Sequence, residues 1–199
     1  RIAGIDPSEA QINYARKLKF NTSTDFIVGD AMSLPYADNS FDVALMALVL
    51  FFVPKPATGV GEMTRITKAG GVIAAYAWDV FGGGLPMEPL HSILRERGIK
   101  YPLPPSKEAS QLNVMQQLWE DAGLEAIETT TFQVQRTFAN FDDYWSVNSV
   151  GPSVAGVLKN LTPSTLEEIK RDLRKVLKRD DTNRIVSVAS ANAVKGAKG

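Results

Sequence analysis

Short apolar segments alternate with amphipathic ones along the first half of the chain. The apolar segments cover residues 1–5, 25–28, 41–49 and 72–78, and turn residues bound each of them. Between the first two segments, Ser8 can cap a helix with Ile12, Ala15 and Leu18 on its apolar face, and a second helix is expected over 57–67. Residues 68–71, Lys-Ala-Gly-Gly, predict a tight turn. This alternation is typical of βαβ units and therefore of a doubly wound, mostly parallel α/β sheet of the Rossmann kind.

The segment 41–49 is apolar at nearly every position, which predicts a strand buried on both faces of the sheet. The second half of the chain begins differently, because 79–105 is rich in Gly and Pro and predicts a long irregular stretch of the kind that often forms a lid. After it we expect a helix over 112–122 ended by Gly123, a strand over 124–138 and a helix over 141–147. An amphipathic helix starts at Thr162-Pro163, with Leu166, Ile169, Leu173, Val176 and Leu177 on one side. A last strand over 184–191 precedes a solvated tail, 195–199.

The amino-acid composition says little about the fold but excludes several classes of function. Lys and Arg number 22, and so do Asp and Glu, so no excess of positive charge is available for a phosphate backbone. Cysteine is absent and His91 is the single histidine, which excludes disulfides and thiolate or multi-histidine metal sites. No apolar run approaches the roughly 20 residues of a membrane-spanning helix. We therefore expect a small-molecule substrate, no metal, no nucleic acid and no membrane, and a cytoplasmic protein, and we leave a homodimer open.

Two aspartates follow predicted strands and are candidates for binding a nucleoside. Asp6, in Gly4-Ile5-Asp6-Pro7-Ser8, can accept hydrogen bonds from both hydroxyls of a ribose. Asp30, in Val28-Gly29-Asp30-Ala31, can accept from the amine of adenine, while the Ala31 amide donates to a ring nitrogen and Met32 and Leu34 enclose the base. Each motif alone fits an ordinary turn aspartate as well. A third motif, Asp38-Asn39-Ser40-Phe41-Asp42, opens the strand whose far end, about Met46 to Leu50, should face a ligand; Asp42 itself is expected to be structural.

Taken together, these motifs and the later run Glu62-Met63-x-Arg65-Ile66-x-Lys68-Ala69-Gly70-Gly71 resemble the class I S-adenosylmethionine-dependent methyltransferases, especially the group that includes the ubiquinone-biosynthesis enzymes. The resemblance is specific over about residues 1–78. It implies a sheet of order 3-2-1-4-5-7-6 with the last strand antiparallel, and S-adenosylmethionine as cofactor. It also implies one domain over 1–199, with a cofactor-binding part at 1–78 and substrate-side insertions and a lid at 79–161. The cofactor contacts it implies are Asp6, Pro7, Gly29, Asp30, Ala31, Met32, Met46 and Ala47.

Two departures from the family pattern change the expectations. The Gly-x-Gly-x-Gly loop should stand roughly 20 residues before Asp6, and with it the central strand of the sheet. Without that strand, segments 1–5 and 41–49 should have unpaired edges, so we expect further N-terminal residues in the intact protein and poor cofactor binding by the chain as given. Leu50-Phe51-Phe52 stands where many relatives have histidines, which favours an apolar substrate wall over a general base.

The expected activity is methyl transfer to an O, N or C atom of a small apolar or aromatic acceptor. Phe51, Tyr76, Trp78 and Asp79 are candidates for contacting that acceptor, and their alternative is core aromatics with a turn aspartate. His91 is a weak candidate for a catalytic base and is expected more readily on a surface or helix face. Two other functions stay open: a nicotinamide-dependent oxidoreductase, and an inactive binding protein that keeps the fold.

Overall fold

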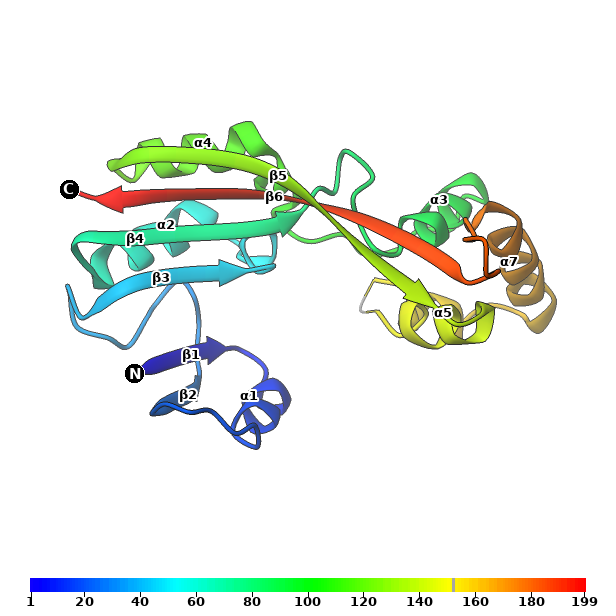
Figure 1. Cartoon of the computed structure of the whole chain (residues 1–199), viewed down its shortest axis with the longest axis horizontal. Helices are drawn as coiled ribbons and strands as arrows, with labels where there is room; N and C mark the ends of the chain where they lie inside the picture. Colours follow the sequence, from blue (N-terminus) through cyan, green and yellow to red (C-terminus); the bar gives the residue numbers. More distant parts are fainter. Residues whose placement is uncertain (152) are drawn as a thin grey trace.

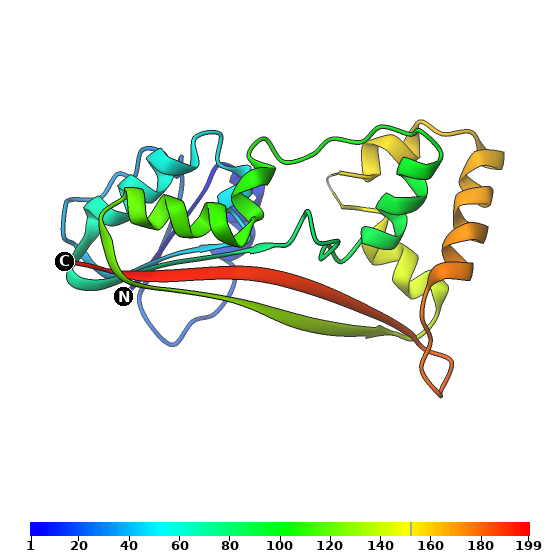
Figure 2. The ribbon, with the colours of Figure 1, turned by 90° about the horizontal axis from the view of Figure 1, so that it is seen from above.

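The computed structural model describes residues 1–151 and 153–199 and shows two bodies joined by a long pair of antiparallel strands (Figures 1 and 2). The first body holds a parallel pair, β1 (Ile2–Asp6) and β2 (Thr24–Val28), and a four-stranded sheet of order β3-β4-β6-β5. The strands of that sheet are β3 (Phe41–Ala47), β4 (Thr67–Trp78), β5 (Leu124–Phe138) and β6 (Ile185–Lys198). The second body is helical and lies at the far end of the antiparallel pair β5–β6.

The strand order agrees with the one that the resemblance implied, with one position vacant. β3 and β4 are parallel, and β6 is antiparallel to both β4 and β5. Six of the seven expected strands are therefore present in the expected spatial order, β2-β1 followed by β3-β4-β6-β5. The position between β1 and β3 is the one that no described strand fills. Among the described strands none pairs with the facing edges of β1 and β3, as predicted.

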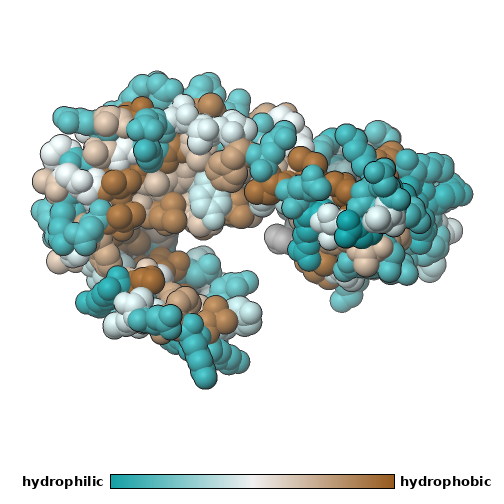
Figure 3. Space-filling model, viewed as in Figure 1, coloured by the Kyte–Doolittle hydropathy of each residue, from teal (hydrophilic) through white to brown (hydrophobic). Residues whose placement is uncertain are grey.

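A hollow of about 310 Å³ separates these two edges, and Figure 3 shows apolar side chains around it. β1 contributes Ala3, Gly4 and Ile5 to its wall, and β3 contributes its residues from 43 to 47. Two unpaired strand edges therefore face this hollow, and such edges can pair with another chain.

One face of the four-stranded sheet is covered by helices α2 (Pro56–Ile66) and α4 (Leu112–Asp121), which lie on the same side in Figure 2. Side chains from alternate sheet positions point toward them and form the core of this body, together with Leu50 and Phe51 of the 3₁₀ turn η1 (Leu50–Phe52). Trp119 of α4 is fully buried there, and its indole Nε1 donates to the carbonyl of Ile73 at 3.0 Å.

The prediction that 41–49 is buried on both faces is wrong. Ala44 and Met46 are buried under α2, but Val43 and Leu45 on the opposite face are 58% and 59% exposed. The strand is also shorter than predicted, because the chain leaves the sheet after Ala47 and turns into η1. Among the described residues no helix covers that second face, so a continuous apolar run has become a half-exposed strand (Figure 2).

Val43→Lys should reduce self-association of the 199-residue chain. Exposed apolar side chains beside an open strand edge promote intermolecular pairing, and a lysine there opposes it. Light scattering at increasing concentration should show a clear fall in aggregated mass relative to the unchanged chain. Val176→Lys, a change at a 55% exposed position at the end of helix α7 (Pro163–Val176), is the matched control and should have little effect. Equal aggregation of the two variants would show that the exposed face of β3 does not mediate self-association.

The helical body has a core of its own, formed by α3 (Glu88–Glu96), α5 (Phe141–Asn148), α6 (Ala155–Lys159) and α7 (Pro163–Val176). α7 begins as predicted, with the Thr162 hydroxyl accepting from the Thr165 amide at 3.2 Å. The prediction of an irregular stretch over 79–105 is wrong in part, because α3 lies inside it. Its sequence contains Pro89 and three charged residues, which obscured a face made of Leu90, Ile93 and Leu94. One position of the predicted lid, residue 152, lies outside the described residues.

Two further predictions fail at the sheet. Residues 68–71 are not a tight turn, because β4 runs through them with a register irregularity opposite Asp42 and a positive φ of 75° at Gly70. The expected solvated tail is the end of β6, which pairs with β4 and β5 as far as Lys198. There, the Lys198 amine donates to the Asn39 side chain and to the Thr67 carbonyl, both at 2.9 Å.

The short helix α1 (Glu9–Ala15) starts where predicted, with the Ser8 hydroxyl accepting from the Gln11 amide at 3.4 Å. Its expected apolar face is only partly used, since Ile12 is buried while Leu18 lies beyond the helix and is 47% exposed. Val176 of the predicted α7 face is likewise exposed. No helix in the described part of the chain is long and apolar enough to cross a bilayer.

Candidate active site

The carboxyl ends of β1 and β2 bring the two predicted nucleoside-binding aspartates to one edge of the fold. Asp6 is paired with Val28 in the parallel register, and the Gly29 amide donates to the Asp6 carbonyl at 3.2 Å. Asp30 follows Gly29 directly, so both carboxylates stand at neighbouring strand tips. Ligands of open α/β sheets bind at this end of the strands.

Each aspartate also holds its own turn. One oxygen of Asp6 accepts from the Ser8 amide at 2.8 Å, and one oxygen of Asp30 accepts from the Met32 amide at 2.8 Å. The turn interpretation is therefore correct for both residues. It does not compete with ligand binding, because in the described hydrogen bonds the second carboxylate oxygen of each has no protein partner and can accept from a ligand.

The other predicted cofactor contacts lie around these two tips. Ala31, Met46 and Ala47 line the hollow between β1 and β3, while Pro7 is exposed beside Asp6. Gly29 has little room for a side chain, since a Cβ there would come within 3.3 Å of Ile5. Met32 packs against the core beneath the loop that follows β2.

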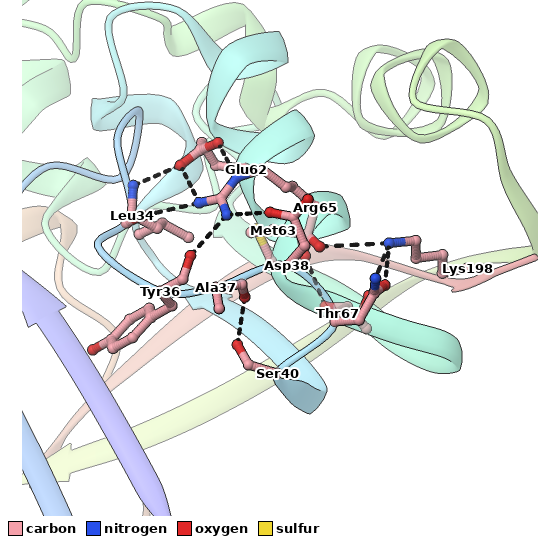
Figure 4. Close-up of polar contacts among 11 residues, drawn as sticks. Leu34, Tyr36, Ala37, Asp38, Ser40, Glu62, Met63, Arg65, Thr67 and Lys198 are labelled. Carbon is pink, nitrogen blue, oxygen red and sulfur yellow. Dashed lines mark hydrogen bonds and ion pairs between the residues drawn. The ribbon is translucent and has the colours of Figure 1, made fainter.

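A charged pair on α2 holds the loop that follows Asp30, as Figure 4 shows. Glu62 accepts from the Leu34 amide at 2.6 Å and from Arg65 at 2.7 Å. Arg65 in turn donates to the carbonyls of Leu34 at 2.9 Å and Tyr36 at 2.7 Å, and to Asp38 at 2.7 Å. The paired guanidinium and the Leu34 amide lower the pKa of the Glu62 carboxyl, so this residue stays ionised.

From the sequence, Glu62 and Arg65 were only parts of a family motif with no role assigned. Their spacing of three on a helix was the available signal, because it puts both on one face. In the structure they position the Ala31–Asp38 loop against α2, which places Ala31 and Met32 beside the strand tips.

Arg65→Met should loosen this loop and thereby weaken binding of a nucleoside cofactor by roughly tenfold, since small displacements of positioning groups are costly. Hydrogen exchange should become faster over 31–38 and stay unchanged in α7. Arg171→Met, which removes a 64% exposed guanidinium from α7, is the control. Unchanged exchange over 31–38 would contradict the positioning role.

A second cavity, of about 380 Å³, opens where β3 and β4 end and the helical body begins. Its wall is almost entirely apolar and is formed by η1, the segments around α3 and a proline-rich strip. The residues are Leu48, Phe51, Phe52, Trp78, Leu85, Pro86, Met87, His91, Pro102, Leu103, Pro104, Pro105 and Ser153. A cavity of this size and polarity suits a small apolar molecule.

Two of the four predicted substrate residues, Phe51 and Trp78, line this cavity, and two do not. Tyr76 lies on the open face of the sheet, its ring centroid 6.1 Å from that of Phe132. Asp79 accepts from the Gly82 amide at 2.9 Å and so caps a turn. Alternation along β4 puts Tyr76 and Trp78 on the same side, so what separates them is their place along the strand: Trp78 is its last residue, at the end where the cavity opens.

His91 lies on a helix face, one of the two placements expected, but it is on the buried face of α3 and not at the surface. It is 2% exposed, and its Nε2 lies 3.0 Å from the Ser153 hydroxyl at the cavity wall. The Tyr101 ring stacks on the imidazole with centroids 4.3 Å apart. Burial lowers the pKa of His91, which therefore stays neutral near pH 7. No three His, Asp or Glu side chains in the described part of the chain are grouped to hold a metal.

The fold is that of the class I methyltransferases. Residues 1–75 match the family described as the methyltransferase domain. Over 60 residues the chain is 47% identical to a demethylmenaquinone methyltransferase of Renibacterium salmoninarum, covering 29% of this chain and 25% of that protein. A sterol 24-C-methyltransferase of Gibberella zeae is 25% identical over 162 residues, 74% of this chain and 39% of its own length.

Solved structures extend the likeness in fold to the whole chain. A methyltransferase candidate from Bacillus halodurans superposes with a TM-score of 0.58 at 18% identity, over 100% of this chain and 83% of that one. An S-adenosylmethionine-dependent methyltransferase of Thermotoga maritima gives 0.52 at 20% identity, over 99% and 72%. The chain spans about a quarter to a third of the length of the demethylmenaquinone methyltransferases that it matches.

Proposed function

We propose that this protein transfers the methyl group of S-adenosylmethionine to an O, N or C atom of a small apolar or aromatic acceptor. The observation that carries the proposal is the apolar cavity at the carboxyl ends of β3 and β4. The arrows of β1 and β3 point the same way in Figure 1, so this cavity opens at the end of the fold where Asp6 and Asp30 stand. A cofactor site and an acceptor site at one edge are what a group transfer requires.

The residues at the strand tips fit the cofactor. Asp6 and Asp30 each offer a carboxylate oxygen to its ribose or adenine, and Met46 and Ala47 lie where its methionine part would run. When bound, S-adenosylmethionine supplies an activated methyl group on its sulfonium. This chain's task is then to orient the acceptor and exclude water, which Phe51, Phe52 and Trp78 do by lining the cavity.

The relatives' names support an apolar acceptor, because one acts on demethylmenaquinone and another on C-24 of a sterol. Both names describe acceptors richer in carbon than in polar groups. The cavity wall of this chain offers the same kind of surface, since most of its side chains are aliphatic, aromatic or proline.

A thermal-shift comparison of the full-length protein separates the three candidate functions. S-adenosylmethionine and S-adenosylhomocysteine should raise Tm, because a ligand that binds only the native state stabilises it, whereas NAD should not. Transfer of labelled methyl to an apolar phenol or amine then tests activity. Stabilisation by NAD alone would favour the oxidoreductase, and cofactor binding without transfer to any acceptor would favour the inactive binding protein.

A further inference from the structure

The apolar cavity has one strongly polar spot, and it is built from two elements distant in sequence. His91 comes from α3 and Ser153 from the segment before α6, and their side chains meet at 3.0 Å. Apart from the Trp78 indole, they bring the only side-chain nitrogen and oxygen atoms among the described residues that line this cavity. Burying the His91 imidazole costs free energy because its nitrogens give up water, and the contact with Ser153 offsets this cost at Nε2 only.

The surroundings of His91 determine which nitrogen carries its proton. Nδ1 has no hydrogen-bond partner, yet it lies 3.9 Å from a carboxylate oxygen of Glu88, whose other oxygen accepts from Arg95. A proton on Nδ1 is attracted by that carboxylate, whereas a lone pair there would be repelled. Tyr101 stacks on the ring and accepts a hydrogen bond from Arg95 at 2.8 Å, so the imidazole has little freedom to turn over.

With the proton on Nδ1, Nε2 is a hydrogen-bond acceptor at the cavity wall. Ser153 can donate to Nε2, or turn its hydrogen toward the sulfur of Met87 at 3.3 Å, and in both arrangements the pair keeps lone pairs for a ligand. The pair therefore selects ligands that donate a hydrogen bond.

We propose that the His91–Ser153 pair binds a hydroxyl group of the acceptor, so that the cavity takes apolar molecules bearing a hydroxyl in preference to otherwise identical ones in which that oxygen is an ether. This inference rests on the proposed function insofar as it calls the ligand a methyl acceptor. Recognition of the ligand's hydroxyl is a property of the cavity itself. It makes His91 and Ser153 specificity-determining residues, while Phe51 and Trp78 supply the apolar contact.

The experiment compares 2-naphthol with 2-methoxynaphthalene, which differ in whether the oxygen can donate. Dissociation constants are measured by ligand-observed NMR on the full-length protein near pH 7, without any cofactor. The native protein should bind the naphthol about fivefold to tenfold more tightly, the value of one neutral hydrogen bond. His91→Phe keeps a ring against Tyr101 and should abolish the preference, as should Ser153→Ala.

Ser92→Ala is the matched control, because its hydroxyl is on the same helix but faces Glu96 at 3.2 Å, outside the cavity. It should keep the full preference. Equal binding of the two naphthalenes by the native protein, or a preference that persists in both His91→Phe and Ser153→Ala, would overturn the inference; if His91→Phe does not fold, Ser153→Ala alone decides. Because no methyl transfer is measured, a preference without activity would refute only the proposed function, and activity without a preference only this inference.

Discussion

Asp6→Asn should weaken the binding of S-adenosylmethionine by about tenfold to a hundredfold. The asparagine oxygen can still accept from the Ser8 amide, so the turn that follows β1 is kept. What disappears is the charged oxygen proposed to accept from the ribose, and hydrogen bonds to charged groups contribute about 1.5–3 kcal/mol each. The loss should therefore appear in affinity while the fold stays intact.

Calorimetry with S-adenosylhomocysteine measures the effect, and circular dichroism verifies the fold. Asp25→Asn is the control, because Asp25 lies near the opposite end of the same strand pair and forms only an exposed ion pair with Arg1 at 3.5 Å. It should leave the affinity unchanged. If Asp6→Asn and the native protein bind with equal affinity, Asp6 does not contact the cofactor.

Trp119→Ala should lower the free energy of unfolding by about 3 to 5 kcal/mol, the usual cost of deleting a large buried aromatic. Trp119 is fully buried between α4 and the sheet, and Gly196 of β6 lies so close that a Cβ there would come within 2.9 Å of the indole. The change also leaves the Ile73 carbonyl without its indole donor. Both losses act on the one covered face of the sheet.

Denaturant unfolding measures this loss of stability. The variant Trp119→Phe separates the contribution of the apolar contact from that of the indole hydrogen bond. The phenylalanine variant retains most of the apolar contact but not the donor, so it should fall between the native protein and Trp119→Ala. Gln116→Ala, on the exposed side of the same helix, should change little, because its amide only bonds Glu120 at 2.8 Å. A loss below about 1 kcal/mol for Trp119→Ala would mean that α4 is not fixed to the sheet as described.

Local signals in the sequence were sufficient for most elements. Thr162-Pro163 and Ser8 marked helix starts, and Gly123, with a φ of 70°, marked a helix end. These predictions held because a cap or a positive φ depends on a few neighbouring residues. The same local signals misplaced the end of β6, because strand pairing with β4 extends the strand through Gly196 where composition suggested a frayed tail.

Burial was harder to predict than element type. The apolar run at 41–49 was correctly a strand, but half of its side chains are exposed, because a strand's burial depends on what covers each face of the sheet. The expected surface exposure of His91 was wrong in the opposite direction, because this residue is buried. No residue close to it in sequence indicates that Tyr101 and Ser153 contact its ring.

The sequence alone thus determined the alternation of strands and helices and the strand-tip positions of Asp6 and Asp30, since these follow from periodicity and short motifs along the chain. The order of the strands and the class of cofactor were implied by the family resemblance. The tertiary structure was needed to show that Glu62 and Arg65 hold the loop after β2, and that Phe51, Trp78, His91 and Ser153 share one cavity. Such groupings join residues up to about a hundred positions apart, and only packing of the helical body against the sheet brings them together.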